Sequence, residues 1–290
     1  MYKIIIITIM SLLFSSCSLK EQSTNNEPPT INHKNSNHKI ALIVAVSDYS
    51  PETSDLPGIK TDINRIKNLL NSWEFNTTIL YNKDSIKLKD YLKKYKKTLN
   101  SNDTFVFYYT GHGSYTKDIN GDEDDGKDET IVLSDGSENM NFLDDDLGYY
   151  FSHIKAKKLL LFDSCHSGTA FKSPSNIVPK SILSKFVRKV IYTGVKGDDN
   201  ITSEYIAITA AQDSEESLAS EDGSFFTSVL IKQLSKPKSI NKSFKEITDE
   251  VTDKIVRACE KADVPAHHPK LSASNKKLEK MSIKEYLGLK

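Results

Sequence analysis

The feature that most constrains the fold is a short apolar run that ends abruptly in small and polar residues. Residues 159–162 (LLLF) are wholly apolar and are followed by Asp-Ser-Cys-His-Ser-Gly. Such a run predicts a strand buried on both faces, as in a mainly parallel sheet. The thiol of Cys165 then lies just past the carboxyl end of this strand, where open α/β sheets place their ligands and their chemistry.

A second apolar run ends in the same way. Residues 104–109 (TFVFYY) lead into Thr110-Gly111-His112-Gly113. A thiol needs a base or an ion-pair partner to react as a thiolate at neutral pH, and imidazole is the usual partner. If the two strands are parallel neighbours, their ends bring His112 and Cys165 together.

The spacing and the surroundings of these two residues resemble those of a known family. His112 lies 53 positions before Cys165, and caspases carry a histidine about 50 residues before their cysteine. The sequence Asp-Ser-Cys-His-Ser-Gly resembles the metacaspase branch of the caspase-like cysteine peptidases. The resemblance extends over residues 39–271. It implies a catalytic His112–Cys165 dyad and an oxyanion hole formed by the backbone N–H groups of Gly113 and Cys165.

The rest of the chain alternates between short apolar runs and amphipathic segments, which predicts βαβ units and a parallel sheet. Together with the resemblance, this predicts an α/β fold: a caspase-like three-layer α/β/α sandwich with a mainly parallel central sheet. The expected strands are 40–46, 77–81, 104–109, 159–162 and 205–209, with a last strand after 265–271. The expected helices are 60–72, 85–99, 224–234 and 243–262. We assign 38–273 to one peptidase domain and 274–290 to a C-terminal tail.

The resemblance also implies a pocket for a basic side chain. Asp163 precedes the cysteine by two residues, and Asp62 and Thr110 match positions of the pocket in metacaspases. Two carboxylates suit a guanidinium or ammonium group, so the resemblance implies cleavage after Arg or Lys. Ile59 departs from the family, which often has a cysteine there. For Asp62 the alternative is a carboxylate that faces the amino-terminal dipole of its helix.

The densest acidic run of the chain, residues 118–129, suggests a cation site. It matches a metacaspase pattern in which Asp128, together with Asp144 and Asp145, would bind calcium. Oxygen ligands without thiol or imidazole suit Ca²⁺. Lys172 stands where the family often has a further carboxylate, and a solvated acidic loop is the alternative. We expect no cofactor to be required for the chemistry, with Ca²⁺ as a candidate activator.

The amino terminus resembles a bacterial lipoprotein signal. Lys3 precedes an apolar segment at residues 4–14, which is too short to span a bilayer as a helix. Small residues then lead to Cys17, the expected lipidation site, although Phe14 replaces the usual leucine. We therefore predict a signal peptide at 1–16, a flexible tether at 17–37, and a protein held on the membrane of a bacterial cell envelope; an ordinary secretory signal is the alternative.

Composition narrows the possible partners. The chain has 290 residues and a formal net charge of zero, so nothing indicates nucleic-acid binding. We expect a monomer that acts on proteins or peptides containing Arg or Lys, and that cuts itself within residues 172–204, near 185–189. Two other functions stay open: a catalytically silent caspase-like binding module, or a thiol hydrolase of another kind.

Overall fold

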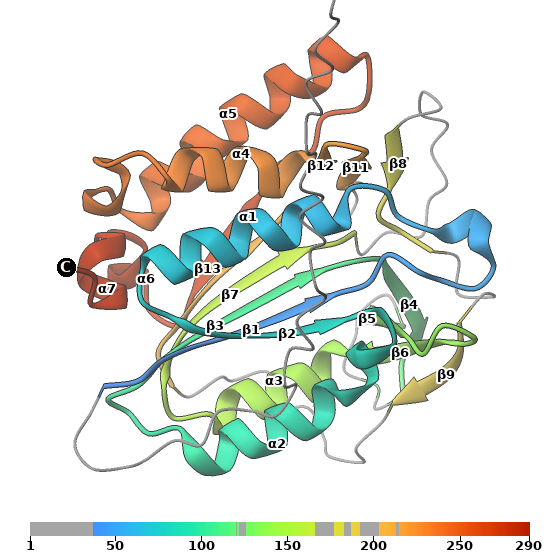
Figure 1. The fold of residues 1–290 in the computed structure, drawn as a ribbon, viewed down its shortest axis with the longest axis horizontal. Helices are drawn as coiled ribbons and strands as arrows, with labels where there is room; N and C mark the ends of the chain where they lie inside the picture. Colours follow the sequence, from blue (N-terminus) through green and yellow to red (C-terminus); the bar gives the residue numbers. More distant parts are fainter. Residues whose placement is uncertain are drawn as a thin grey trace, which may run out of the picture.

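A six-stranded sheet forms the centre of the computed structural model, which describes residues 37–119, 121, 126–165, 177–182, 187–191, 203–212 and 215–290 (Figure 1). The strand order is β13-β10-β7-β3-β1-β2. All neighbours pair in parallel except β10 and β13, which are antiparallel. The strands are β1 (Lys39–Ala45), β2 (Asn76–Tyr81), β3 (Thr104–Thr110), β7 (Lys157–Asp163), β10 (Tyr205–Thr209) and β13 (Lys270–Ala273).

Helices cover both faces of this sheet (Figure 1). One face carries α1 (Ile59–Ser72), α4 (Phe225–Leu234) and α5 (Phe244–Ala262). The other face carries α2 (Leu88–Thr98) and α3 (Asp144–His153). Each layer of helices has its own hydrophobic cluster against the sheet, because β1, β3 and β7 bury side chains on both faces. The predicted three-layer α/β/α sandwich with a mainly parallel sheet is confirmed.

Two smaller sheets lie outside the central one and were not predicted. The first joins β4 (Gly113–Lys117), β5 (Lys127–Ser134), β6 (Asn139–Leu143) and β9 (Val187–Ile191). The second joins β8 (Ile177–Pro179), β11 (Leu218–Ser220) and β12 (Gly223–Ser224). Apart from β5, these strands have two to five residues, and most of them mix polar with apolar residues, so they lack the longer apolar runs that mark the central strands.

The predicted elements differ from the observed ones mainly at their ends. The helix expected from residue 85 begins as a 3₁₀ helix at Asn82–Lys87 and becomes α2 at Leu88. The segment assigned to a tail contains α6 (Lys276–Glu279) and α7 (Ile283–Leu287). Tyr286 and Leu287 are buried in the same cluster as α1 and α5, so this segment packs as part of the domain. In the described part of the chain, no helix is both long and apolar enough to cross a membrane.

Candidate active site

The ends of β3 and β7 place the predicted catalytic residues next to one another. Thr110 at the end of β3 pairs with Asp163 at the end of β7. His112 lies two residues after Thr110, and Cys165 lies two residues after Asp163. Gly113, the residue after His112, packs directly on the Cys165 peptide, since a Cβ atom at 113 would lie 1.5 Å from the Cys165 carbonyl oxygen. Only glycine allows this approach of the two backbones.

The imidazole of His112 is buried and oriented by backbone groups. Its Nε2 atom lies 2.6 Å from the carbonyl oxygen of Ser54, and its ring packs against Tyr49 with 4.5 Å between ring centroids. A carbonyl can only accept, so Nε2 carries the proton and Nδ1 is the basic nitrogen. Nδ1 is buried and has no hydrogen-bond partner among the described residues. Burial lowers the pKa of His112 to about 4, although the hydrogen bond with Ser54 opposes this shift.

The thiol of Cys165 is fully buried in this conformation. Its Sγ donates to the carbonyl oxygen of Ser217 at 3.2 Å. Burial raises the pKa of the Cys165 thiol, and the nearby carboxylate of Glu216 raises it further. Both members of the dyad are therefore neutral at pH 7 while the site is closed.

The site is closed by a residue of the chain itself. The carbonyl oxygen of Lys180 accepts hydrogen bonds from the backbone N–H groups of Gly113, at 2.9 Å, and of Cys165, at 3.2 Å. These are the two donors expected to form the oxyanion hole. The Lys180 N–H in turn donates to the Ser217 carbonyl at 2.9 Å. The backbone of Lys180 thus lies where a substrate peptide bond would have to lie.

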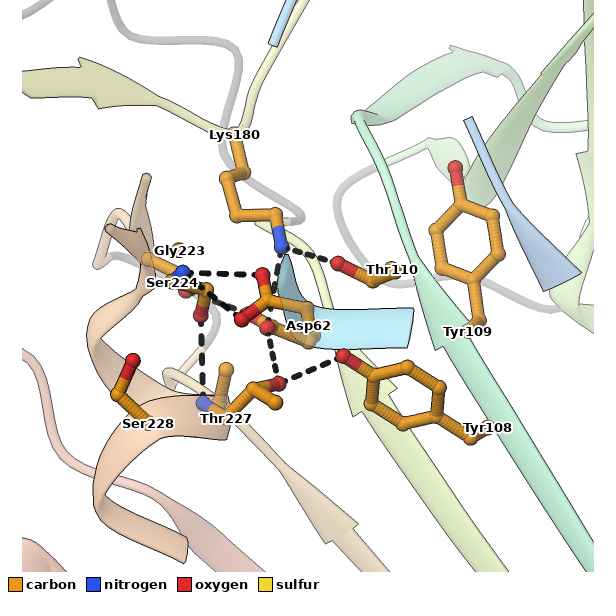
Figure 2. A network of polar contacts seen from close by, with 12 residues as sticks. Asp62, Tyr108, Tyr109, Thr110, Lys180, Gly223, Ser224, Thr227 and Ser228 are labelled. Carbon is orange, nitrogen blue, oxygen red and sulfur yellow. Dashed lines mark hydrogen bonds and ion pairs between the residues drawn. The ribbon is translucent and has the colours of Figure 1, made fainter. Parts of the chain in front are cut away.

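The side chain of Lys180 occupies a buried acidic pocket (Figure 2). Its Nζ lies 3.1 Å from Asp163 Oδ2 and donates to Thr110 Oγ1 at 2.6 Å. Asp62 forms another wall and accepts from the Ser224 N–H at 2.9 Å. Burial raises the pKa of Asp62 to about 7, the Lys180 ammonium lowers it, and the Asp163 carboxylate raises it. Asp62, Thr110 and Asp163 therefore gather around one ammonium group, and all three are fully buried.

Hydroxyl groups from two other elements hold the pocket carboxylate. Asp163 accepts from Ser217 Oγ at 3.0 Å and from Thr227 Oγ1 at 2.6 Å. Because the Thr227 proton points to Asp163, the hydroxyl of Tyr108 must donate to Thr227 Oγ1, at 2.6 Å. Sequence reasoning missed Ser217, Thr227 and Ser224. Of these three residues, only Ser224 could have been suggested by the sequence, because serine is preferred at helix N-caps and Ser224 is the N-cap of α4.

The proposed calcium ligands are not assembled into a site by the described residues. Asp128 lies in β5, and its Oδ2 accepts from the Ile119 N–H at 3.1 Å. Asp144 and Asp145 lie in the first turn of α3. Across the described ranges, no group of three or more His, Cys, Asp or Glu side chains could hold a metal ion. Residues 122–125 of the acidic run lie outside these ranges, as do Cys17, the tether and Lys185.

Comparisons with known proteins agree with this geometry. A family model described as the caspase domain matches residues 38–277. The chain is 32% identical over 165 residues to Metacaspase-1 of Meyerozyma guilliermondii, which covers 52% of this chain and 40% of that protein. It spans a similar 40% of Metacaspase-1 of Debaryomyces hansenii. The chain therefore spans less than half the length of these two curated relatives.

Solved structures share the fold at low sequence identity. A protein of Geobacter sulfurreducens superposes with a TM-score of 0.67 at 21% identity, over 84% of this chain and 97% of the other. Caspase-1 of Spodoptera frugiperda superposes with a TM-score of 0.55 at 15% identity, over 85% of this chain and 92% of the other. At these identities the likeness shows the fold alone.

Proposed function

Because the chain belongs to the caspase domain family, we propose that it is a cysteine endopeptidase of metacaspase type that cleaves after Lys or Arg. One observation carries the proposal. Lys180 lies in the site as the residue before a scissile bond would, with its carbonyl oxygen on the Gly113 and Cys165 N–H groups. Its ammonium lies 3.1 Å from Asp163.

The proposed reaction follows from the groups around the Lys180 carbonyl. The thiol of Cys165 gives its proton to Nδ1 of His112, and Sγ attacks the carbonyl carbon of the substrate. The Gly113 and Cys165 N–H groups stabilise the oxyanion that forms. Protonated His112 then gives its proton to the leaving amine, and the peptide bond breaks. Water, deprotonated by the same imidazole, hydrolyses the resulting thioester.

The charge of the pocket supports the choice of substrate. A cation that enters the pocket loses its hydration by water. The carboxyl groups of Asp163 and Asp62 and the hydroxyl of Thr110, all of them buried, compensate for that loss. An acidic residue would place a further negative charge against the Asp163 carboxylate, and an apolar residue would leave that carboxylate without a counter-ion, whereas Asp62 also pairs with Arg65 at 3.5 Å. The pocket therefore favours Lys and Arg over the Asp that caspases recognise.

The position of Lys180 also makes it the candidate for self-cleavage. Among the described residues between 172 and 204, Lys180 is the basic residue whose side chain lies in the acidic pocket, whereas Lys172, Lys185 and Lys196 lie outside the described residues. We therefore move the expected cut from residues 185–189 to the bond between Lys180 and Ser181. Until that bond is cut or displaced, the segment keeps other substrates out of the site.

Calcium activation and a lipid anchor at Cys17 belong to the proposal as expectations from the sequence. No step of the reaction above requires a metal ion. Calcium dependence and the site of membrane attachment are measured separately from the chemistry.

The proposal is tested with fluorogenic peptides that end in Lys, Arg or Asp, incubated with the full-length protein in Ca²⁺ or in EGTA. We expect turnover of the Lys and Arg peptides and none of the Asp peptide. Absence of turnover under all conditions, together with binding of Lys peptides, would favour the silent binding module. Turnover of small amides and esters without peptide cleavage would favour another kind of thiol hydrolase.

A further inference from the structure

The chain on both sides of Lys180 is hydrogen-bonded to the walls of the site. On the amino-terminal side, β8 pairs antiparallel with β11, with Pro179 opposite Leu218, Val178 opposite Ala219 and Ile177 opposite Ser220. This is the manner in which extended peptides add to a sheet edge, where the backbone provides affinity and alternate side chains provide selectivity.

The residues after the Lys180–Ser181 bond are also hydrogen-bonded to the walls of the site. The N–H of Ile182 donates to the Gly113 carbonyl at 3.1 Å, and Ser114 Oγ donates to the Ile182 carbonyl at 3.0 Å. Between them, the hydroxyl of Ser181 donates to Glu216 Oε1 at 3.0 Å. Six consecutive residues, 177–182, are therefore held across the site by hydrogen bonds, the first three of them as β8.

The side chains of this strand are not buried equally. Lys180 is fully buried, Ile182 is 3% exposed and Ile177 is 8% exposed. Val178 and Pro179, which lie between the buried positions, are only partly buried. Ile177 and Ile182 both belong to the hydrophobic cluster that includes Leu218 and Ala219 of β11. The cleft thus has three enclosed positions, of which one is acidic and two are apolar.

We propose that this cleft selects substrates at three positions: a basic residue before the scissile bond, an aliphatic residue three places earlier, and an aliphatic residue two places after the bond. The inference rests on the proposed function. The matching sequence is Ile-Val-Pro-Lys-Ser-Ile, as in residues 177–182. Full burial of an aliphatic side chain favours its binding by about 10- to 100-fold over a small polar one.

The test uses the full-length protein and quenched fluorescent peptides that contain Ile-Val-Pro-Lys-Ser-Ile. Serine replaces the first isoleucine, the last isoleucine or, as the matched control, the partly buried valine. We expect kcat/KM to fall about 10- to 100-fold for each isoleucine peptide, and by a clearly smaller factor for the valine peptide, whose side chain packs against the same cluster but is only partly buried. Changes in the peptide leave the fold of the enzyme untouched.

A second measurement uses the chain as its own substrate. The full-length variant Ile182→Ser should self-cleave at Lys180 more slowly than Val178→Ser, with both variants checked for folding by thermal denaturation. Equal cleavage of all Lys peptides and equal self-cleavage of the two variants would overturn the three-position selection and leave the proposed function intact. Failure to cut any Lys or Arg peptide, and failure to self-cleave, would overturn both.

Discussion

At the scale of single residues, the burial of His112 and Cys165 keeps the dyad neutral. Burial lowers the pKa of His112 to about 4 and raises that of the Cys165 thiol. When the Lys180 segment leaves, water reaches both groups, the two shifts diminish, and proton transfer from thiol to imidazole becomes easier. The closed site is therefore slow to react, and cleavage of the Lys180–Ser181 bond within it should be slower than turnover of a peptide after the segment has left.

If Cys165 and His112 act as the proposed catalytic dyad, Cys165→Ala and His112→Ala should each abolish peptide cleavage. Since the two residues act as one unit, the double variant should be no slower than either single one. Steady-state rates on a Lys peptide measure this, with thermal denaturation as the check on folding. A His112→Ala enzyme that retained the wild-type rate would remove His112 from the mechanism.

From the raised pKa of Asp62 we expect a specific dependence of protein stability on pH. Its pKa is raised by burial from an ordinary 3.8 to about 7, so between these values the folded protein binds a proton that the unfolded chain releases. The contribution of Asp62 to the free energy of unfolding therefore falls as pH rises from 4 to 7, by at most about 1.4 kcal/mol per pH unit. Asp62→Asn should remove this contribution, so the free energy of unfolding of the variant should fall less, or rise more, over that range.

Urea unfolding at several pH values measures this slope, in a Cys165→Ala background that prevents self-cleavage. Other titrating groups are common to both proteins and cancel in the comparison. Identical pH profiles for the two proteins would mean that Asp62 is ionised as readily as in water.

At the scale of elements, the carboxyl end of β7 positions both Asp163 and Cys165. Asp163 is its last residue and Cys165 follows two positions later, so the strand that positions the proposed nucleophile also positions the carboxylate of the proposed substrate pocket. Asp163 is fully buried, whereas Asp249 of α5 forms an exposed pair with Lys245. This contrast provides a matched pair of substitutions.

Asp163→Asn should raise KM for Lys and Arg peptides by about 10²-fold, because the bound cation loses its buried counter-charge. Asp249→Asn, on an exposed helical pair worth only a few tenths of a kcal/mol, should change neither KM nor kcat. Kinetics of both variants on the same Lys peptide measure the difference. Unchanged KM in Asp163→Asn would place the recognised cation elsewhere.

The elements also show how far sequence could predict the molecule. The central strands and the long helices carry strong local signals, because burial on two faces gives apolar runs and burial on one face gives helical periodicity. The ends of β3 and β7 were therefore found, and with them His112 and Cys165. Lys180, Ser217 and Thr227 could not be found, because their places depend on how β8, β11 and α4 pack around the sheet.

At the scale of the whole molecule, lipidation of Cys17 and attachment to a membrane are predictions from the sequence alone. If Cys17 is lipidated, the wild-type protein should enter the detergent phase in Triton X-114 partitioning and incorporate labelled palmitate in a bacterial host. Cys17→Ser should remain in the aqueous phase and unlabelled, with unchanged turnover of a Lys peptide, since residues 1–36 lie outside the matched domain. Equal partitioning of the two proteins would favour an ordinary secretory signal.

In the proposed self-cleavage the chain is its own first substrate, because residues 177–182 fill the site of the molecule that contains them. Intramolecular cleavage should occur between Lys180 and Ser181, at a rate independent of protein concentration. Mass spectrometry of the fragments in Ca²⁺ and in EGTA identifies the bond, and Cys165→Ala is the control that cannot cut. Lys180→Ala should lose this cut, whereas Lys185→Ala should keep it. Fragments that end at Lys185 or Lys189, or equal cleavage in the Cys165→Ala protein, would show that the segment in the site is not the one that is cut.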